Sequence, residues 1–206
     1  MKLFSSLRSI LVLLTLAGAS LSVANAQTGI RLGYPGYNGN GCPIGSADVT
    51  LSPDGSALTL LFSNFTAQAG GGGYDAKRMD RKNCNISIPV TVPGGYSVSI
   101  ITVDYRGFIS VPRGGYARFA AEYFFAGITG PRAAKIFNGS YQNDYTITNN
   151  LGVEAMVWSP CGASVNLRVN SSMLVQTNAQ FEDAYASVDS ADFSAGVIFQ
   201  FAYRRC

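Results

Sequence analysis

Apolar and polar residues alternate along most of the chain after residue 42, and this period of two is typical of half-buried β-strands. The cleanest row sets Val165, Leu167 and Val169 against polar residues. In SVSIITVDY the alternation changes phase at Ile100–Ile101, which predicts a bulge or a strand buried on both faces. Strands are predicted over 58–62, 85–92, 96–109, 115–126, 142–148, 153–158, 164–170 and 197–204.

Glycine- and proline-containing turn sequences separate these runs, for example at 52–55, 93–95, 112–115 and 138–139. No helical stripe of useful length occurs after residue 26. Many short strands joined by turns predict an all-β fold, a single-domain antiparallel β-sandwich of the jelly-roll or immunoglobulin-like type. We expect this domain to span residues 42–206.

Two segments lack the alternation. Residues 27–41, rich in Gly, Tyr and Asn, predict an extended N-terminal tail or a leading edge segment. Residues 68–83, QAGGGGYDAKRMDRKN, contain four consecutive glycines. A phosphate-binding loop would need a lysine and a hydroxyl in register and a helix behind them, and neither is present. We interpret residues 68–83 as a solvated loop.

Residues 1–26 have the organisation of a secretory signal peptide. Lys2 and Arg8 precede an apolar run from Ile10 to Val23, and Ala24-Asn25-Ala26 matches the small-x-small cleavage pattern. The apolar run is short for a membrane-spanning helix, which needs about 20 residues. We therefore expect cleavage after Ala26, no transmembrane segment in the mature chain, and a secreted, periplasmic or cell-surface protein.

The predicted mature chain is almost neutral. Without Lys2 and Arg8, 13 basic side chains remain against 12 acidic ones. A protein that binds nucleic acid usually carries a basic face, so the charge argues against a nucleic-acid partner. No motif for a cofactor is present, and we expect none.

The four cysteines are Cys42, Cys84, Cys161 and Cys206, with no Cys-x-x-Cys pair and no histidine in the chain. A zinc site normally groups its ligands at short spacing, so we predict no metal. In an oxidising compartment an even number of cysteines predicts disulfides. Three pairings are possible, and we favour Cys42–Cys84 with Cys161–Cys206, which joins neighbours along the chain.

The absence of histidine also restricts catalysis. Ser-His-Asp and Cys-His systems need an imidazole to accept the proton, so neither can operate here. Paired carboxylates, as in glycoside hydrolysis, remain as an alternative, with Glu122 and Glu154 as candidates in strand-like segments. Isolated acids on solvent-facing strand positions are commoner, so we expect a protein that is not an enzyme.

Several motifs recur in the order of a known family. They are CPIGS (42–46), SPDGSALTLLFSNF (52–65), RKNC (81–84), YRGF (105–108) and WSPCG (158–162). In these motifs the chain resembles the secreted family catalogued as domain of unknown function 4360, over about Cys42 to Cys206. The resemblance implies a secreted protein with these cysteines. It brings no established activity or ligand.

These observations favour a secreted or surface-associated, non-catalytic protein that binds glycan or protein or contributes to an extracellular layer. The alternatives are a carboxylate-dependent hydrolase of extracellular polymer and a small outer-membrane β-barrel. The candidate binding surface is Tyr105, Arg106 and Phe108, which lie among glycine-rich turns. Aromatic faces and a guanidinium suit sugar rings and carboxylated sugars.

Overall fold

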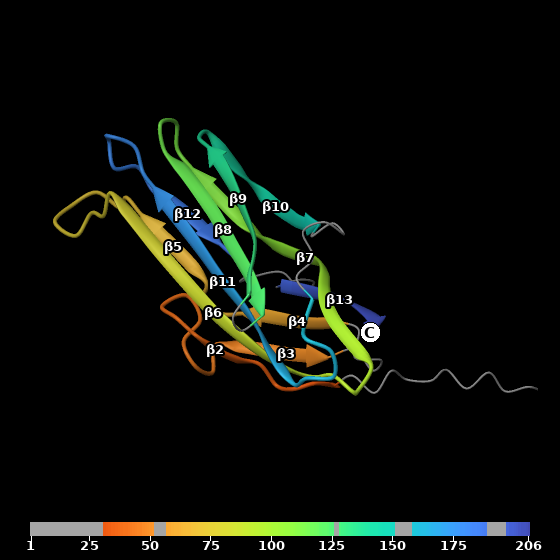
Figure 1. Ribbon diagram of the computed structural model, residues 1–206. Coiled ribbons are helices and arrows are strands. Elements are labelled where there is room, and N and C mark those ends of the chain that lie inside the picture. The colour runs from red at the N-terminus through yellow and green to blue at the C-terminus, as the bar shows by residue number, and fades with distance from the viewer. Residues whose placement is uncertain (1–30, 52–56, 126–127, 151–157, 189–196) are drawn as a thin grey trace, which may run out of the picture.

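The structure is a computed structural model, and it describes residues 31–51, 57–125, 128–150, 158–188 and 197–206. Two antiparallel sheets pack face to face around one hydrophobic core, as Figure 1 shows. The predicted antiparallel β-sandwich is confirmed. The expected signal peptide and most of the predicted strand 153–158 lie outside the described residues. Within the described residues, no helix is long and apolar enough to cross a membrane.

The first sheet has the order β1-β6-β11-β8-β9, with β2 also paired to β6. Its strands are β1 (Arg31–Leu32), β2 (Gly36–Asn38), β6 (Met79–Thr91), β8 (Tyr116–Phe125), β9 (Ile128–Asn138) and β11 (Val165–Gln176). Neighbours in this sheet are far apart in sequence, because β11 inserts between β6 and β8.

The second sheet has the order β3-β4-β13-β7-β12-β5, and β10 pairs with the other edge of β7. Its strands are β3 (Ala47–Leu51), β4 (Ala57–Phe62), β5 (Thr66–Ala69), β7 (Tyr96–Val111), β10 (Tyr141–Asn150), β12 (Ala184–Ser187) and β13 (Val197–Arg205). The sixteen-residue β7 is the strand on which this sheet is assembled, because it pairs with β13, β12 and β10.

The change of phase at Ile100–Ile101 is a bulge. Phe201 pairs with Ile100 and Gln200 pairs with Thr102, so Ile101 is an extra residue opposite the β13 ladder. The bulge resets the alternation, and Val103, Tyr105 and Ile109 therefore face the core. One of the two sequence-based interpretations is thus confirmed.

Strand β9 was not predicted, because Pro131 interrupts its sequence. The structure places β9 at the edge of the first sheet. An edge strand can lack one backbone N–H donor without losing a hydrogen bond in the interior of the sheet. Pro131 also falls at a bulge, since the register with β8 shifts between the pairs Glu122–Arg132 and Phe124–Thr129. Pro131 is therefore tolerated for two reasons: β9 is an edge strand, and the bulge interrupts its pairing with β8 at this point.

The predicted loop 68–83 is shorter than expected. Strand β5 continues to Ala69 and β6 begins at Met79, so the interpretation was wrong at both ends. The polar run is compatible with a strand because Arg81 and Asn83 face away from the core. Asp80, on the other face, is tied down by accepting a hydrogen bond from the backbone N–H of Gln68 at 3.1 Å.

The core contains aliphatic side chains from both sheets, with an aromatic contact between the sheets. Phe119 of β8 and Tyr105 of β7 are fully buried, and their ring centroids are 4.4 Å apart. Because one ring comes from each sheet, this contact fixes how the two sheets face each other. Burial of such large rings is a main source of stability.

A short polar chain crosses the core beside this contact. The hydroxyl of Tyr123, on β8, donates to the hydroxyl of Tyr105 at 3.0 Å and accepts from the side-chain amide of Asn149 at 2.7 Å. Burial raises the pKa of Tyr123 to about 12 and raises the pKa of Tyr105 well above its ordinary value. Both phenols are therefore neutral donors and acceptors at ordinary pH.

We expect the protein to lose stability in alkali because of these two tyrosines. Their folded-state pKa values are raised, so their contribution is complete below pH 10 and is lost as the pH rises through about 12, because the unfolded chain ionises first. Denaturant unfolding followed between pH 9 and pH 12 should show a falling midpoint. A Tyr123→Phe variant should show a smaller fall over the same range, and an equal fall would contradict the assignment.

Both predicted disulfides are confirmed. Cys42 is bonded to Cys84 with a Cα–Cα distance of 5.3 Å, and Cys161 is bonded to Cys206 at 6.1 Å. The first bridge is fully buried between residues 31–42, which we call the N-terminal segment, and β6, whereas Cys161 and Cys206 are exposed. The bridges therefore act at different depths of the sandwich.

Candidate functional site

The outward face of the first sheet carries a hollow of about 530 Å³. Pairing across β6, β11, β8 and β9 aligns its side chains in three rows that run across the strands. The first row is Arg81, Leu174, Arg118 and Ile136. The middle row is Asn83, Ser172, Ala120 and Ala134. The third row is Asn85, Asn170, Glu122 and Arg132.

The hollow follows the middle row, because three of its four members have short side chains. Ser172, Ala120 and Ala134 form a low floor. Arg81 and Arg118 of the first row rise on one side of it, and the polar third row rises on the other, whereas Leu174 and Ile136 do not line the hollow. We call this hollow, bounded by the three rows, the trench. It crosses four strands, and three steps of about 4.8 Å between strands give it a length of about 14 Å.

Strand alternation positions the trench side chains. On β6, Cys84, Ile86 and Ile88 are buried in the core, so Arg81, Asn83 and Asn85 are presented on the opposite face. The same alternation on β11 buries Leu167, Val169 and Met173 and turns Asn170 and Ser172 outward. The trench thus rests on the rigid core rather than on loops.

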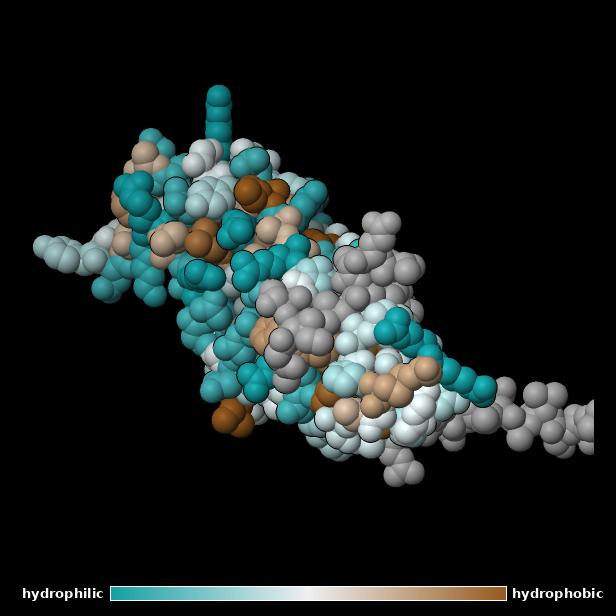
Figure 2. All heavy atoms as spheres, viewed as in Figure 1, coloured by the Kyte–Doolittle hydropathy of each residue, from teal (hydrophilic) through white to brown (hydrophobic). Residues whose placement is uncertain are grey.

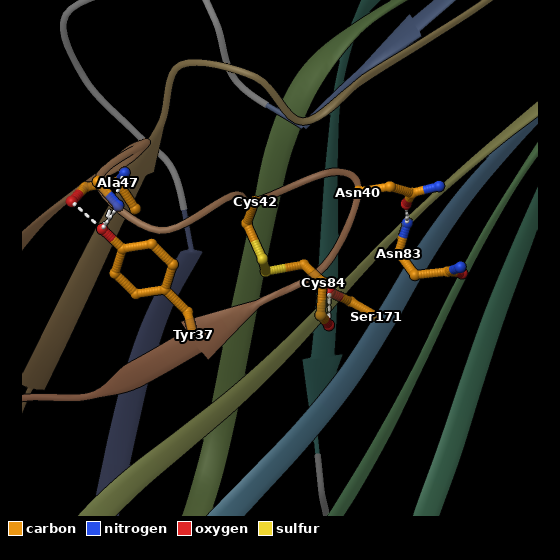
Figure 3. The surroundings of a disulfide bond; sticks show 8 residues. Tyr37, Asn40, Cys42, Ala47, Asn83, Cys84 and Ser171 are labelled. Atoms are coloured by element: carbon orange, nitrogen blue, oxygen red, sulfur yellow. Dashed lines mark hydrogen bonds between the residues drawn. A yellow bond between two sulfur atoms is a disulfide. The ribbon is translucent and has the colours of Figure 1, made fainter.

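The N-terminal segment secures the β6 side of the trench, as Figure 3 shows. The side chain of Asn40 accepts a hydrogen bond from the backbone N–H of Asn83 at 2.6 Å. It also donates to the backbone carbonyl of Arg81 at 3.1 Å. Ser171 donates to the carbonyl of Cys84 from the other side of β6. The amide of Asn40 therefore takes the place of a neighbouring strand along this part of β6.

The hydroxyl of Tyr37 holds the same segment against the second sheet. It donates to the carbonyl of Ala47 at 3.0 Å and accepts from the backbone N–H groups of Gly45 and Ala47 (Figure 3). Residues 31–38, expected as a tail or an edge segment, form the edge strands β1 and β2 along β6. The segment is part of the sandwich.

The trench is rich in cationic groups. Three arginines and one glutamate line it, which gives a formal charge of +2. Arg132 donates through Nε to Glu122 at 2.9 Å, and its Nη2 lies 2.8 Å from the same carboxylate oxygen. Arg81 and Arg118 form no ion pair within the described part of the chain. Their guanidinium groups are free to meet an external anion.

The view in Figure 2 shows a surface dominated by hydrophilic residues, with hydrophobic ones scattered among them. The larger exposed hydrophobic side chains, such as Ile44 and Met79, come from different segments of the chain. Among the described residues, these exposed hydrophobic side chains form no single cluster along one strand.

The predicted surface of Tyr105, Arg106 and Phe108 does not form in the structure. Tyr105 is fully buried against Phe119, while Arg106 and Phe108 point to the other face of β7 and are half-buried. Successive residues of a strand alternate between faces, so Tyr105 cannot share a surface with the other two. Phe108 instead contacts Tyr185, with ring centroids 6.2 Å apart.

The candidate carboxylate pair is only half described. Glu122 lies in the trench and is bound to Arg132. Glu154 lies outside the described residues. Within the described residues, no group of three or more acidic, cysteine or histidine side chains is placed to hold a metal ion.

A second hollow of about 580 Å³ lies beside the glycine-rich turn 70–73. Its lining mixes both signs of charge, including Asp80, Lys82 and Asp183, and Lys82 lies 3.8 Å from Asp80. Because its cations have acidic neighbours, this hollow shows less preference for an anion than the trench.

Sequence reasoning missed the trench. Arg81 was assigned to a loop, Arg118 was not singled out, and β9 was absent from the predicted strands. The signal was the polar phase of each alternating strand, which marks outward positions. Which outward positions share a row depends on the order β6-β11-β8, and the sequence does not show that order.

Comparisons with known proteins agree with the sequence resemblance. Residues 28–206 match the model of the family described as "Domain of unknown function (DUF4360)". An "Uncharacterized secreted protein" of Arthroderma benhamiae is 32% identical over 171 residues, which cover 82% of this chain and 69% of that protein. The secreted relative and the two disulfides confirm the predicted location outside the cytoplasm.

Among solved structures, the chain matches TmCBM61 in complex with β-1,4-galactotriose at 13% identity and a TM-score of 0.26. That match covers 83% of this chain and 88% of the other chain. A likeness at this TM-score transfers no site. The family match and the 32% identical relative show that the chain belongs to the family described as domain of unknown function DUF4360.

Proposed function

We propose that the protein is a secreted, non-catalytic glycan-binding module and that its ligand lies in the trench. The observation that carries this proposal is the coincidence of a low, elongated floor with hydrogen-bonding side chains along both of its sides. A chain of sugar rings needs an extended surface with many donors and acceptors, rather than a deep apolar pocket. The trench length of about 14 Å suits a short run of sugar units.

The chemistry of the trench suits hydroxyl groups. Asn83, Asn85 and Asn170 offer amide groups that both donate and accept, and Ser172 adds a hydroxyl. The methyl groups of Ala120 and Ala134 can contact the C–H faces of sugar rings without blocking them. The middle row therefore offers polar groups at its β6 and β11 end and methyl groups at its β8 and β9 end, which suit the hydroxyls and the C–H faces of a carbohydrate.

Binding is favoured over hydrolysis. Glycoside hydrolysis uses two carboxyl groups, one on each side of the scissile bond. Within the described residues, Glu122 is the carboxylate in the trench lining, and it is engaged by Arg132 at 2.8–2.9 Å. One carboxylate cannot flank a bond on both sides, and this one is already held by a guanidinium.

We expect a bulky side chain on the trench floor to weaken glycan binding. Ala120→Tyr fills the floor from an outward strand position where tyrosine is well tolerated. Binding of the disulfide-bonded protein to a glycan array and to insoluble polysaccharides should fall at least about tenfold, the equivalent of about 1.4 kcal/mol. The matched control is Gln142→Tyr, at an exposed position of β10 on the second sheet.

Thermal unfolding of both variants should match the wild type, which separates blocking from misfolding. Equal retention of Ala120→Tyr and wild type on a bound glycan would exclude the trench as the site. Failure of the wild type to bind any glycan would refute the function itself.

A further inference from the structure

The trench carries more positive charge than a neutral sugar would need. Arg132 is neutralised by Glu122, but Arg81 and Arg118 are exposed and have no carboxylate partner in the described part of the chain. Both lie in the same row, on β6 and β8, with Leu174 of β11 between them. Their shared row is the wall along one side of the floor.

We propose that the trench ligand is an acidic polysaccharide, with Arg81 and Arg118 each binding a carboxylate of the chain. This proposal rests on the glycan-binding function proposed above and specifies the class of sugar. A guanidinium group offers two parallel N–H donors that match the two oxygens of a carboxylate. The wall thus provides two carboxylate sites along one ligand chain.

The spacing of the two arginines supports this assignment. They are two strands apart, so their backbone positions are separated by about 10 Å. Leu174 of β11 stands between them in the row. A polyuronate repeats its carboxylates along the chain and can place one at each arginine, whereas a small acidic sugar carries a single carboxylate.

The neighbouring amides add hydrogen bonds that a simple counter-ion would not use. Asn83 lies in the middle row beside Arg81 of the first row, and Asn40 fixes the backbone of Asn83 by accepting a hydrogen bond from its N–H. Ala120 is adjacent to Arg118 and leaves open space above the floor. A uronate bound to either guanidinium would therefore place its ring over the floor.

The test measures binding of the disulfide-bonded mature protein to polygalacturonate and to alginate. Each polymer is compared with its carboxyl-reduced form. We expect the acidic forms to bind at least about tenfold more tightly than the reduced forms. Binding of the acidic forms should weaken as salt is raised, because exposed charges are screened. Equal binding of acidic and reduced forms would overturn the charge assignment and leave the glycan-binding function standing.

The residues are tested with the double variant Arg81→Gln, Arg118→Gln, which should lose at least about tenfold in affinity for the acidic polymers. The double variant Arg113→Gln, Arg205→Gln removes the same two charges at exposed positions outside the trench and should bind like the wild type. Arg118→Lys keeps the charge but not the planar fork, and it should bind between the wild type and the glutamine variant.

Other outcomes separate the ideas. Loss of binding in both double variants would indicate net charge rather than the trench, and would overturn the assignment to Arg81 and Arg118. Equal affinity for a sulfated polysaccharide of matched size would overturn carboxylate recognition. Binding of neither acidic nor neutral glycans would refute both this inference and the proposed function.

Discussion

Replacement of Phe119 by alanine should lower the free energy of unfolding by about 3–5 kcal/mol, the range for truncation of a large buried aromatic. Phe119 is fully buried on β8 and its ring lies 4.4 Å from that of Tyr105 on the facing sheet. The variant would lose the transfer free energy of the ring and leave a cavity between the two sheets. Neither sheet can close that cavity without changing how they pack.

The measurement is denaturant unfolding at neutral pH with both disulfides intact. Phe108→Ala is the matched control, because Phe108 is half-buried on the outward face of β7. It should cost much less, about 1 kcal/mol. Equal losses in the two variants would show that the ring contact between the sheets has no special weight.

Removal of the Cys42–Cys84 bridge by substitution of both cysteines with alanine should cost about 4 kcal/mol. The bridge closes a loop with a sequence separation of 42, and the chain-entropy model assigns that amount to a loop of this size. The bridge also fastens the N-terminal segment, whose Asn40 pairs with the backbone of β6. Removal of the bridge should therefore loosen the β6 side of the trench as well as lower the free energy of unfolding.

The second bridge provides the control. Cys161–Cys206 has a sequence separation of 45, so its removal should increase the conformational entropy of the unfolded chain by nearly the same amount as removal of Cys42–Cys84. Its cysteines are exposed, whereas Cys42 and Cys84 are fully buried. Unfolding should show the larger loss for the buried pair. The buried bridge should lose packing contacts in addition to the loop constraint. A larger fall in the free energy of unfolding on removal of Cys161–Cys206 would contradict this expectation.

The fold was largely readable from the sequence because alternation of period two is a local property. The row from Val165 to Val169 predicted the start of β11, and the phase change at Ile100–Ile101 predicted the bulge in β7. Strand β9 could not be predicted in the same way, because proline is normally excluded from strands. Pro131 is tolerated only because β9 is an edge strand, and the sequence does not show which strands lie at an edge.

The candidate site was much less readable, for two physical reasons. The predicted surface grouped Tyr105 with Arg106 and Phe108 because they lie among glycine-rich turns, but all three lie within β7, where alternation turns Tyr105 into the core and the other two outward. The trench depends on register between strands that are distant in sequence, such as Ser172 beside both Asn83 and Ala120. Such pairings are set by the packing of the whole sandwich rather than by any local pattern.

The facing pair Asn85 and Asn170 in the third row has one more consequence. Each asparagine begins an Asn-x-Ser sequence, which is an acceptor for N-linked glycosylation in a eukaryotic secretory pathway. A glycan attached to either side chain would be bulky enough to cover the floor from within. The host that makes the chain would then decide whether the trench is open to an external polymer or occupied by the protein's own sugar.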